Sequence, residues 1–534
     1  MADAGSELIL ANLIAARAAT MPERDVLTFV HVVADGRLVD EVRTYRALWD
    51  RARRLAAALE RDGIRDGATV ALVMQNHPEF VEAMIAASIT AAVFVPIDPR
   101  TRDHKLRFML QHAECEAAIV ADYALATLRA VRPSLPKLRR VWVLETGLDV
   151  ALGPDERPLA AVQRGPVPDV LVRSTDPDAP MQMLFTSGTT GDPKAILASH
   201  RRFGEAAAMG GVFGLRPDDR PYTGLSLTHA NAQLITLGSA LHAGLRAVIS
   251  RKFTKSRLWD VTRRHGCTVF NLLGGMTVAI WSEPPRPDDA DNPVRMVISA
   301  GMPAAIWDAF RRRFGVEIYE FYGAAEGGLT LHPPGAGPVG SCGKPPPMLE
   351  LAILDDDGNR CPPGVAGEIC FRPVDGSSPE VRYFKQPDAS RAKTAGGWLR
   401  MGDVGHVDAD GWLFFHYRKG GGIRRNGDFV SPGFVEKSIA ECPGVSDVCV
   451  YGVPAASGAP GEQDIVAAVV PADAATFDPQ AVFRHCRRTL EANVVPTWVQ
   501  IVREIPKTAS EKPLERVLRD AFERDRDRIH AEAA

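Results

Sequence analysis

Thr186-Ser187-Gly188-Thr189-Thr190-Gly191-Asp192-Pro193-Lys194 is the stretch on which the interpretation of the whole chain depends. It follows a short apolar run, 181–185, typical of a buried strand. Glycines let the backbone approach a ligand closely, and successive backbone N–H groups in such a turn form a concavity that binds anions. The hydroxyl groups add donors, and the lysine adds a point charge suited to phosphate. The stretch therefore predicts a polyphosphate-binding loop rather than a solvated linker. It is not a Walker loop, because the Gly-Lys-Ser/Thr ending is absent.

Other motifs follow in a fixed order along the chain. They are Thr44-Tyr45-Arg46-Ala47-Leu48, Tyr322-Gly323-Ala324-Ala325-Glu326, Trp398-Leu399-Arg400-Met401-Gly402-Asp403, Arg418-Lys419 before a glycine-rich turn, and Pro506-Lys507-Thr508-Ala509-Ser510-Glu511-Lys512. Together with the first stretch they resemble the motifs of the adenylate-forming superfamily, which includes acyl-CoA synthetases, peptide-synthetase adenylation domains and luciferases. The resemblance spans nearly the whole chain. Segment 227–233 and the arginine-rich loop before Gly427 are most similar to the crotonobetaine/carnitine-CoA ligase branch.

Bulk composition narrows the class of protein. A chain of 534 residues with 46% hydrophobic and 24% charged residues is expected to form more than one globular domain. The net charge of −3 gives no reason to expect a nucleic-acid partner. The eight cysteines include no Cys-x-x-Cys pair, and the N-terminus lacks the pattern of a signal peptide. The most apolar window, 80–95, is too short to span a membrane. We expect a cytoplasmic protein, with a homodimer possible.

Hydrophobic periodicity predicts an α/β fold. Short apolar runs alternate with amphipathic helical segments through 42–144 and again through 246–322, which favours parallel-rich sheets covered by helices. The Pro/Gly-rich segment 153–180 is predicted to be a linker. After Pro333 short strands and turns indicate a small β-rich unit. Segment 335–340 matches a dinucleotide fingerprint formally, but it lacks the preceding strand and is predicted to be a loop.

The resemblance implies a domain division. Residues 1–416 would form the N-terminal AMP-binding adenylation domain, 417–422 with Gly420-Gly421-Gly422 the hinge, and 423–534 a small mobile α+β domain. In the last domain the pattern reads strand, strand, helix, strand over 445–451, 465–470, 479–490 and 499–502.

The resemblance also implies a nucleotide site. Tyr322 would stack on adenine beside the turn 300–302, Asp403 would accept the ribose hydroxyls, and Arg418 would contact ribose and phosphate. Mg²⁺ would be held by Glu326 and Thr190, and Lys512 would reach the acyl carboxylate and α-phosphate. The residues implied in ATP or AMP binding are Thr186, Ser187, Gly188, Thr189, Thr190, Gly191, Lys194, Ala300, Gly301, Met302, Phe321, Tyr322, Gly323, Ala325, Asp403 and Arg418. Those implied in catalysis are Lys512, Lys194, Arg418, His229 and Glu326.

For the second substrate the resemblance implies coenzyme A. Its path would be lined by Arg424, Arg425, Gly427 and Asp428, and the acyl pocket by His229, Leu272, Gly274, Met276 and Phe321. The implied reaction is ping-pong: a carboxylic acid and ATP give acyl-AMP and pyrophosphate, and coenzyme A then gives the thioester and AMP. The mostly apolar pocket residues favour an apolar or weakly polar acid.

Four positions depart from the superfamily pattern. Ala325 replaces a threonine, Tyr417 an aspartate, Asp428-Phe429 a Glu-Asn pair and Glu511 a glycine. Loss of one hydroxyl hydrogen bond to a charged group costs about 1.5–3 kcal/mol, so Ala325 predicts a slower enzyme or a compensating donor. Two alternatives remain open: an enzyme that loads a carrier-protein thiol, and a non-catalytic regulator that binds AMP or an acyl group.

Overall fold

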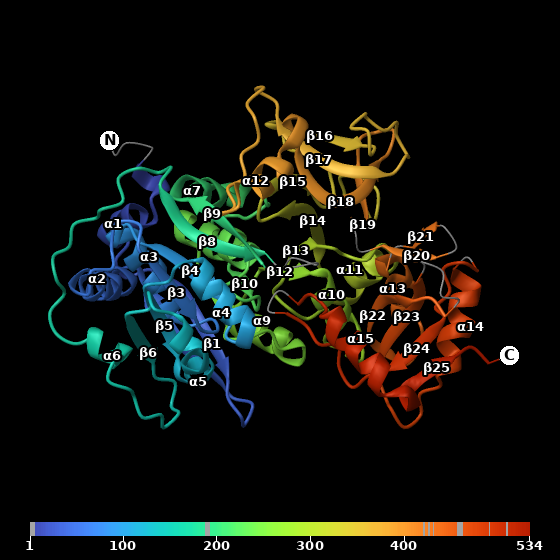
Figure 1. The fold of residues 1–534 in the computed structure, drawn as a ribbon, viewed down its shortest axis with the longest axis horizontal. Helices are drawn as coiled ribbons and strands as arrows, with labels where there is room; N and C mark the ends of the chain where they lie inside the picture. The colour runs from blue at the N-terminus through green and yellow to red at the C-terminus, as the bar shows by residue number, and fades with distance from the viewer. Residues whose placement is uncertain are drawn as a thin grey trace. The chain divides into compact units, whose positions relative to one another are not determined.

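The computed structural model describes residues 6–186, 193–419, 422–425, 428–430, 432–456, 463–490, 492–508 and 511–533 (Figure 1). It divides into two compact units. Unit 1 comprises Met1–Asn271, Pro293–Met296 and Val381–Ala392, and unit 2 comprises Leu272–Asn292, Val297–Glu380 and Lys393–Ala534. Among the described residues no helix combines the length and apolar character needed to cross a membrane.

Unit 1 contains a seven-stranded sheet in the order β7-β6-β5-β3-β4-β8-β9. Its strands pair in parallel except β8 and β9, which are antiparallel. The bounds are β3 (Thr69–Val73), β4 (Val93–Ile97), β5 (Ala117–Ala121), β6 (Arg140–Leu144), β7 (Glu156–Pro158), β8 (Pro180–Thr186) and β9 (Lys194–Ser199). The predicted linker 153–180 thus contains a strand, β7, which pairs with β6 at the edge of the sheet. The short helix α6 (Leu159–Val162) follows it, and its Leu159 side chain is buried.

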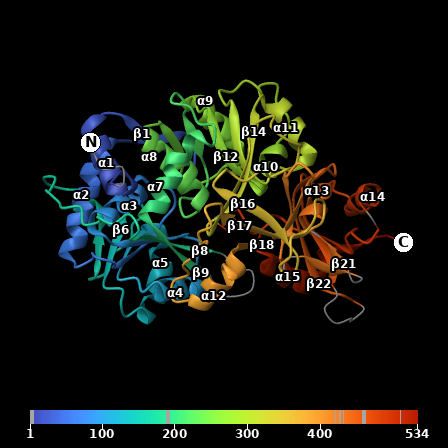
Figure 2. The same ribbon diagram turned by 90° about the horizontal axis from the view of Figure 1, so that it is seen from above.

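Helices cover both faces of this sheet. Leu106, Met109 and Leu110 of α4 (Asp103–His112), with Leu125 and Leu128 of α5 (Asp122–Val131), pack on one face. Figures 1 and 2 show α2 (Tyr45–Arg61) and α3 (Pro78–Thr90) on the other side. The start of α2 is encoded locally, because the side chain of Thr44 accepts a hydrogen bond from the Ala47 N–H and caps the helix.

A second set of strands in unit 1 runs in the order β2-β1-β11-β10-β12. Only β1 and β2 are antiparallel. The bounds of these strands and of the helices near them are α1 (Leu10–Thr20), β1 (Asp25–Val32), β2 (Leu38–Thr44), α7 (His200–Ala208), β10 (Pro221–Thr223), a π-helix (Ala232–Gly238), α8 (Ser239–Ala243), β11 (Ala247–Ser250), α9 (Leu258–His265) and β12 (Val269–Leu273). The repeated β-α-β pattern confirms the α/β fold predicted from the sequence.

Unit 2 begins with α10 (Gly274–Trp281) and contains the hairpin of β14 (Glu317–Ala324) and β15 (Gly327–His332). Between α10 and this hairpin, the chain forms β13 (Met296–Ala300) and α11 (Trp307–Phe314). An antiparallel sheet follows, built from β16 (Leu349–Leu354), β17 (Gly367–Pro373), β18 (Leu399–Val407) and β19 (Leu413–Arg418). It is the predicted β-rich part, and segment 335–340 forms turns outside any strand or helix. The helix before β18 is α12 (Pro387–Lys393).

The C-terminal part of unit 2 has its own sheet, β22-β23-β24-β25, beside the short pair β20-β21. The bounds are β20 (Ile423–Arg425), β21 (Asp428–Val430), α13 (Pro432–Ala440), β22 (Val445–Pro454), β23 (Gln463–Pro471), α14 (Pro479–Thr489), β24 (Trp498–Ile501), α15 (Glu515–Arg524) and β25 (Ile529–Ala531). One face of the sheet packs on α13 and α14, and the other on Leu518 and Phe522 of α15. The predicted strand, strand, helix, strand order is confirmed.

Candidate active site

The predicted polyphosphate loop connects β8 to β9, and Thr186 pairs with Lys194 at the end of the two strands. The Thr186 hydroxyl donates to the Lys194 carbonyl oxygen at 3.4 Å. The Lys194 side chain is exposed, and its Nζ lies 5.3 Å from the centroid of the Tyr383 ring. Ser187, Gly188, Thr189, Thr190 and Gly191 lie outside the described residues. The hairpin geometry therefore presents the lysine beside the start of the loop.

In unit 2 the structure brings together Tyr322, Asp403 and Arg418. The Tyr322 hydroxyl donates to Asp403 Oδ2 at 2.6 Å, and Arg418 Nε lies 3.8 Å from Oδ1. Asp403 on β18 pairs directly with Arg418 on β19. Burial raises the pKa of Asp403, while Tyr322 and Arg418 oppose that shift. The Tyr322 ring lies 6.3 Å from the rings of both Phe371 and Phe415, so its aromatic faces are partly framed by other rings.

Sequence reasoning missed Lys393, at the end of α12. Its Nζ donates to the Met401 carbonyl oxygen at 3.1 Å. Burial lowers the pKa of Lys393, and the carboxylates of Glu326 and Asp403 oppose this effect while Arg418 adds to it. The lysine therefore belongs to the same electrostatic cluster. No motif marks it, because its side chain reaches the cluster through the packing of α12 and not through a fixed spacing along the chain.

Glu326 stands at the turn between β14 and β15, and its side chain is buried with a relative exposure of 7%. Within the described residues no group of three or more His, Cys, Asp or Glu side chains forms a preassembled metal site. Mg²⁺ is commonly bound through one or two carboxylates together with substrate phosphates. A single carboxylate in a phosphate site thus fits this ion, and Thr190 lies outside the described residues.

Glu320, also missed, holds the predicted adenine turn. Its side chain on β14 is 2% exposed, and its carboxylate accepts hydrogen bonds from the N–H groups of Gly301 at 2.5 Å and Met302 at 3.1 Å. Gly301 has φ 106°, a conformation that glycine adopts without strain. On the other side a Cβ atom at Gly274 would stand 2.9 Å from the Gly301 carbonyl oxygen. The turn 300–302 therefore packs between the Glu320 carboxylate and the backbone of Gly274. The sequence feature that could have identified Glu320 is its position as an acidic residue inside an apolar strand.

The lysine-bearing loop near the C-terminus is closed on itself. The Thr508 N–H donates to the Lys512 carbonyl oxygen at 2.8 Å, and the Lys512 N–H donates to Thr508 Oγ1 at 3.2 Å. Burial and the nearby Arg418 lower the pKa of Lys512, while Glu515 and Asp403 oppose the shift. The Lys512 ammonium therefore shares the field of Asp403 and Arg418. Glu511, the residue that replaces a glycine, has φ 57°.

The predicted acyl-pocket residue His229 is neutral at physiological pH. Its Nδ1 accepts a hydrogen bond from the Asn231 N–H at 3.2 Å, so the neutral ring carries its proton on Nε2. Burial lowers the pKa of His229 to about 4. Leu272, Met276 and Phe321 are buried.

The predicted coenzyme A residues are described only in part. Arg425 Nη1 donates to the Val495 carbonyl oxygen at 2.5 Å, so this arginine is engaged inside the C-terminal part. Gly427 and the side chains of Arg424 and Asp428 lie outside the described residues.

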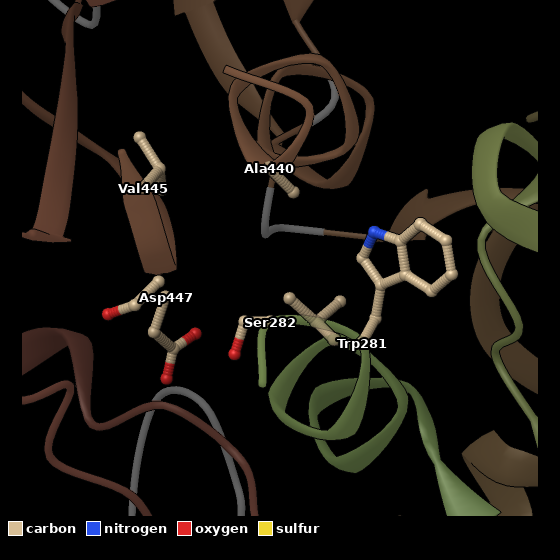
Figure 3. A pocket seen from close by; sticks show the side chains of 7 residues that line it. Trp281, Ser282, Ala440, Val445 and Asp447 are labelled. Carbon is tan, nitrogen blue, oxygen red and sulfur yellow. The ribbon is translucent and has the colours of Figure 1, made fainter. Parts of the chain in front are cut away.

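A small pocket of about 100 Å³ lies between α10 and the start of β22 (Figure 3). Trp281 and Ser282 from α10 and its end face Ala440, Val445 and Asp447 across it. None of the predicted site residues lines it, and it has room for a few waters but not for a nucleotide.

Comparisons with known proteins support one reaction class. The family profile described as AMP-binding enzyme matches residues 14–375, and the one described as AMP-binding enzyme C-terminal domain matches 435–512. The chain is 30% identical to a sulfoacetate–CoA ligase of Cupriavidus necator, over 94% of this chain and 96% of the relative. It is 28% identical to a crotonobetaine/carnitine–CoA ligase of Salmonella typhi, over 89% of this chain and 93% of the relative.

Solved structures share the fold. An anthranilate CoA ligase in complex with anthranoyl-AMP has a TM-score of 0.83 at 23% identity, and the match covers 97% of this chain and 98% of that chain. A benzoate CoA ligase from Burkholderia xenovorans has a TM-score of 0.80 at 22% identity, with coverages of 96% and 99%.

The first prediction concerns His229. Because the pKa of His229 in the folded protein, about 4, lies below the ordinary histidine pKa of about 6.5, the unfolded chain binds more protons between these values. His229 therefore destabilises the protein as the pH falls through this window. His229→Gln should lose less thermal stability than the wild type between about pH 7 and pH 5. His77 and His200 shift in the same direction and stay in both proteins, so they cancel in the comparison. Equal losses in both proteins would contradict the assignment.

The second prediction concerns the backbone at Glu511. A non-glycine residue in the left-handed region carries about 1–2 kcal/mol of strain, of which glycine recovers part at a cost of about 0.5–1 kcal/mol in chain entropy. Glu511→Gly should therefore raise the free energy of unfolding by up to about 1 kcal/mol. Glu511→Ala is the control, because alanine keeps the strain but lacks the charge. A similar gain in both variants would assign the effect to charge instead.

Proposed function

Because this chain belongs to the AMP-binding enzyme family, we propose that it is an acid–thiol ligase that converts a carboxylic acid to acyl-AMP and then to acyl-CoA. The observation that carries the proposal is the charged cluster of unit 2, in which Lys512 shares the field of Asp403 and Arg418. A lysine in that position supplies the counter-charge that a carboxylate needs while it attacks a phosphate ester. The named relatives catalyse ligations to coenzyme A, in agreement with this reaction class.

In the first half-reaction a carboxylate oxygen of the acid attacks the α-phosphorus of ATP, and pyrophosphate leaves. Lys194 and the loop 186–194 would hold the triphosphate, Tyr322 and the turn 300–302 the adenine, and Asp403 the ribose. Arg418 and Lys512 would offset the charge on the α-phosphate and carboxylate. Mg²⁺, held by Glu326 and Thr190, would neutralise phosphate charge when bound.

In the second half-reaction the thiol of coenzyme A gives up its proton, its sulfur attacks the acyl carbon, and AMP leaves. We propose that 423–534 rotates about the hinge 417–422, so that Gly427 replaces Lys512 at the site. Gly427 would allow pantetheine to pass along the backbone, while Arg424, Arg425 and Asp428 would lie near the coenzyme. His229 would line the acyl pocket with Leu272, Gly274, Met276 and Phe321, and it would offer its Nε2–H as a donor.

Lys393 is a candidate for the group that compensates for the threonine hydroxyl missing at Ala325. A threonine hydroxyl is missing from the turn at Glu326, and Lys393 places an ammonium group in the field of that same glutamate. We propose that Lys393 supplies the compensating positive charge. A cytoplasmic location is also proposed, supported by eight cysteines that are all free. A homodimer, which the sequence leaves possible, stays a prediction.

Two other activities compete with the ligase. An enzyme that loads a carrier-protein thiol would form acyl-AMP but would not discharge it to free coenzyme A, and a regulator would release no pyrophosphate. Pyrophosphate release from a panel of acids, measured with and without free coenzyme A, separates the three.

Lys512→Ala should lower the rate of acyl-AMP formation by about 100-fold or more, because it removes a charge aimed at the developing transition state. Conversion of supplied acyl-AMP to acyl-CoA should stay within about twofold of the wild type, because the lysine is needed only in the adenylating orientation. Arg516→Ala, which removes an exposed cation from the neighbouring α15, is the control and should leave both rates unchanged. Equal losses in both half-reactions would refute the proposed domain rotation.

Lys393→Met should slow acyl-AMP formation by about tenfold, the effect expected for one lost interaction with a charged group. Ala325→Thr in the same chain should restore part of the rate, because the hydroxyl returns a donor to the site. The two substitutions should therefore be non-additive in single-turnover measurements. Lys385→Met, which removes an exposed lysine paired with Glu114, is the matched control. Additive effects would show that the two positions act separately.

A further inference from the structure

Residues beside the proposed acyl pocket form a buried chain of amide and hydroxyl groups. The Thr236 hydroxyl donates to Asn271 Oδ1 at 3.0 Å, and Asn271 Nδ2 donates in turn to Asn231 Oδ1. Asn231 is 8% exposed, Asn271 2% and Thr236 3%. Asn271 lies on β12 directly before Leu272, Thr236 lies in the π-helix Ala232–Gly238, and Asn231 immediately precedes that helix. These hydrogen bonds therefore connect segment 231–236, which follows His229, with Asn271, which precedes Leu272.

This arrangement fixes the orientation of both amides. With Thr236 as the donor, the oxygen of Asn271 is occupied, its nitrogen points to the oxygen of Asn231, and the nitrogen of Asn231 becomes the free end. Within the part of the chain that the structure describes, Asn231 Nδ2 is buried and has no hydrogen-bond partner. Buried donors in native proteins are nearly always paired with protein, ligand or ordered water, so this donor is available to an acceptor that enters the site.

Among the described residues, the side chains joined by these hydrogen bonds are uncharged. His229 is neutral because burial lowers its pKa to about 4, and its ring is held by the Asn231 N–H. The remaining partners in the chain are amides and a hydroxyl. An anionic group would lose its hydration here without gaining a counter-charge, whereas a neutral acceptor oxygen would gain a hydrogen bond at little desolvation cost. The π-helix beside Asn231 is consistent with a ligand site, because such wide turns are frequent at functional sites.

We infer that the substrate is a carboxylic acid that carries an uncharged hydrogen-bond acceptor on its chain, such as a keto, ether or amide oxygen, and that Asn231 Nδ2 binds this oxygen. This inference rests on the proposed ligase function and narrows its substrate class. Asn231 would be the specificity-determining residue, while Asn271 and Thr236 would be positioning residues that set the direction of its amide. The mostly apolar pocket expected from the sequence would then contain one hydrogen-bond donor, Asn231 Nδ2.

The test compares heptanoic acid with the oxo-heptanoic acids that carry one keto group at successive carbon atoms. Pyrophosphate release should give at least one oxo acid with a kcat/KM about tenfold above that of heptanoic acid. In Asn231→Leu this ratio should fall to about one, mainly through a higher KM for the oxo acid, while the KM for ATP stays unchanged. Thr236→Val should lower the ratio partly, because Asn271 loses the donor that fixes its orientation.

Asn12→Leu is the control, because Asn12 bonds Ser6 far from the amide chain in sequence and should keep the wild-type ratio. Turnover of no acid at all would refute the ligase function itself. Turnover of heptanoic acid as fast as every oxo acid by the wild type would refute only the substrate inference, and this comparison requires no variant to fold. A preference for sulfoacetate over all neutral acids would overturn the assignment of an uncharged acceptor.

Discussion

The carboxylate of Asp403 is the point on which the charged cluster depends. It accepts the Tyr322 hydroxyl at 2.6 Å and stands opposite Arg418 across two paired strands. Lys393, Arg418 and Lys512 all interact electrostatically with it. Glu326 and Glu368 also act on Lys393, and Glu515 acts on Lys512. Under the proposed function, the phosphates of ATP would lie among these three cations, whose charge would attract them.

The order of the motifs made most of the fold predictable, and it also led to one predicted site for residues from separate motifs. Tyr322 and Asp403 were assigned to one site from separate motifs, and they share a hydrogen bond. The parallel-rich sheets and the smaller β-rich part were also foreseeable, since the periods of the apolar runs encode strands and helices directly. Segment 153–180 was misjudged in part, because the short β7 at the sheet edge carries too few residues to show a period.

Residues that act through packing were not predictable in the same way. Glu320 and Lys393 reach their partners because β14 and α12 place them there, and neither has a diagnostic spacing along the chain. The polar group that we propose for the acyl pocket was not predictable for a related reason. Asn231 lies within segment 227–233, but its hydrogen-bond partner Asn271 lies forty positions away in the chain, on β12.

The left-handed backbone of Glu511 would affect the rotation that we propose for the C-terminal domain. The Glu511 carbonyl oxygen lies 3.4 Å from the position that a Cβ atom on Gly275 would take, so Glu511 contacts the start of α10. In this contact its backbone has the strained φ of 57°. If Glu511 loses its backbone strain when the domain rotates, the strain raises the free energy only of the arrangement in which the lysine loop contacts α10. A difference of about 1 kcal/mol shifts the populations about fivefold towards the departed state. If the C-terminal domain rotates as we propose, Glu511 would favour release of the lysine loop once the adenylate has formed.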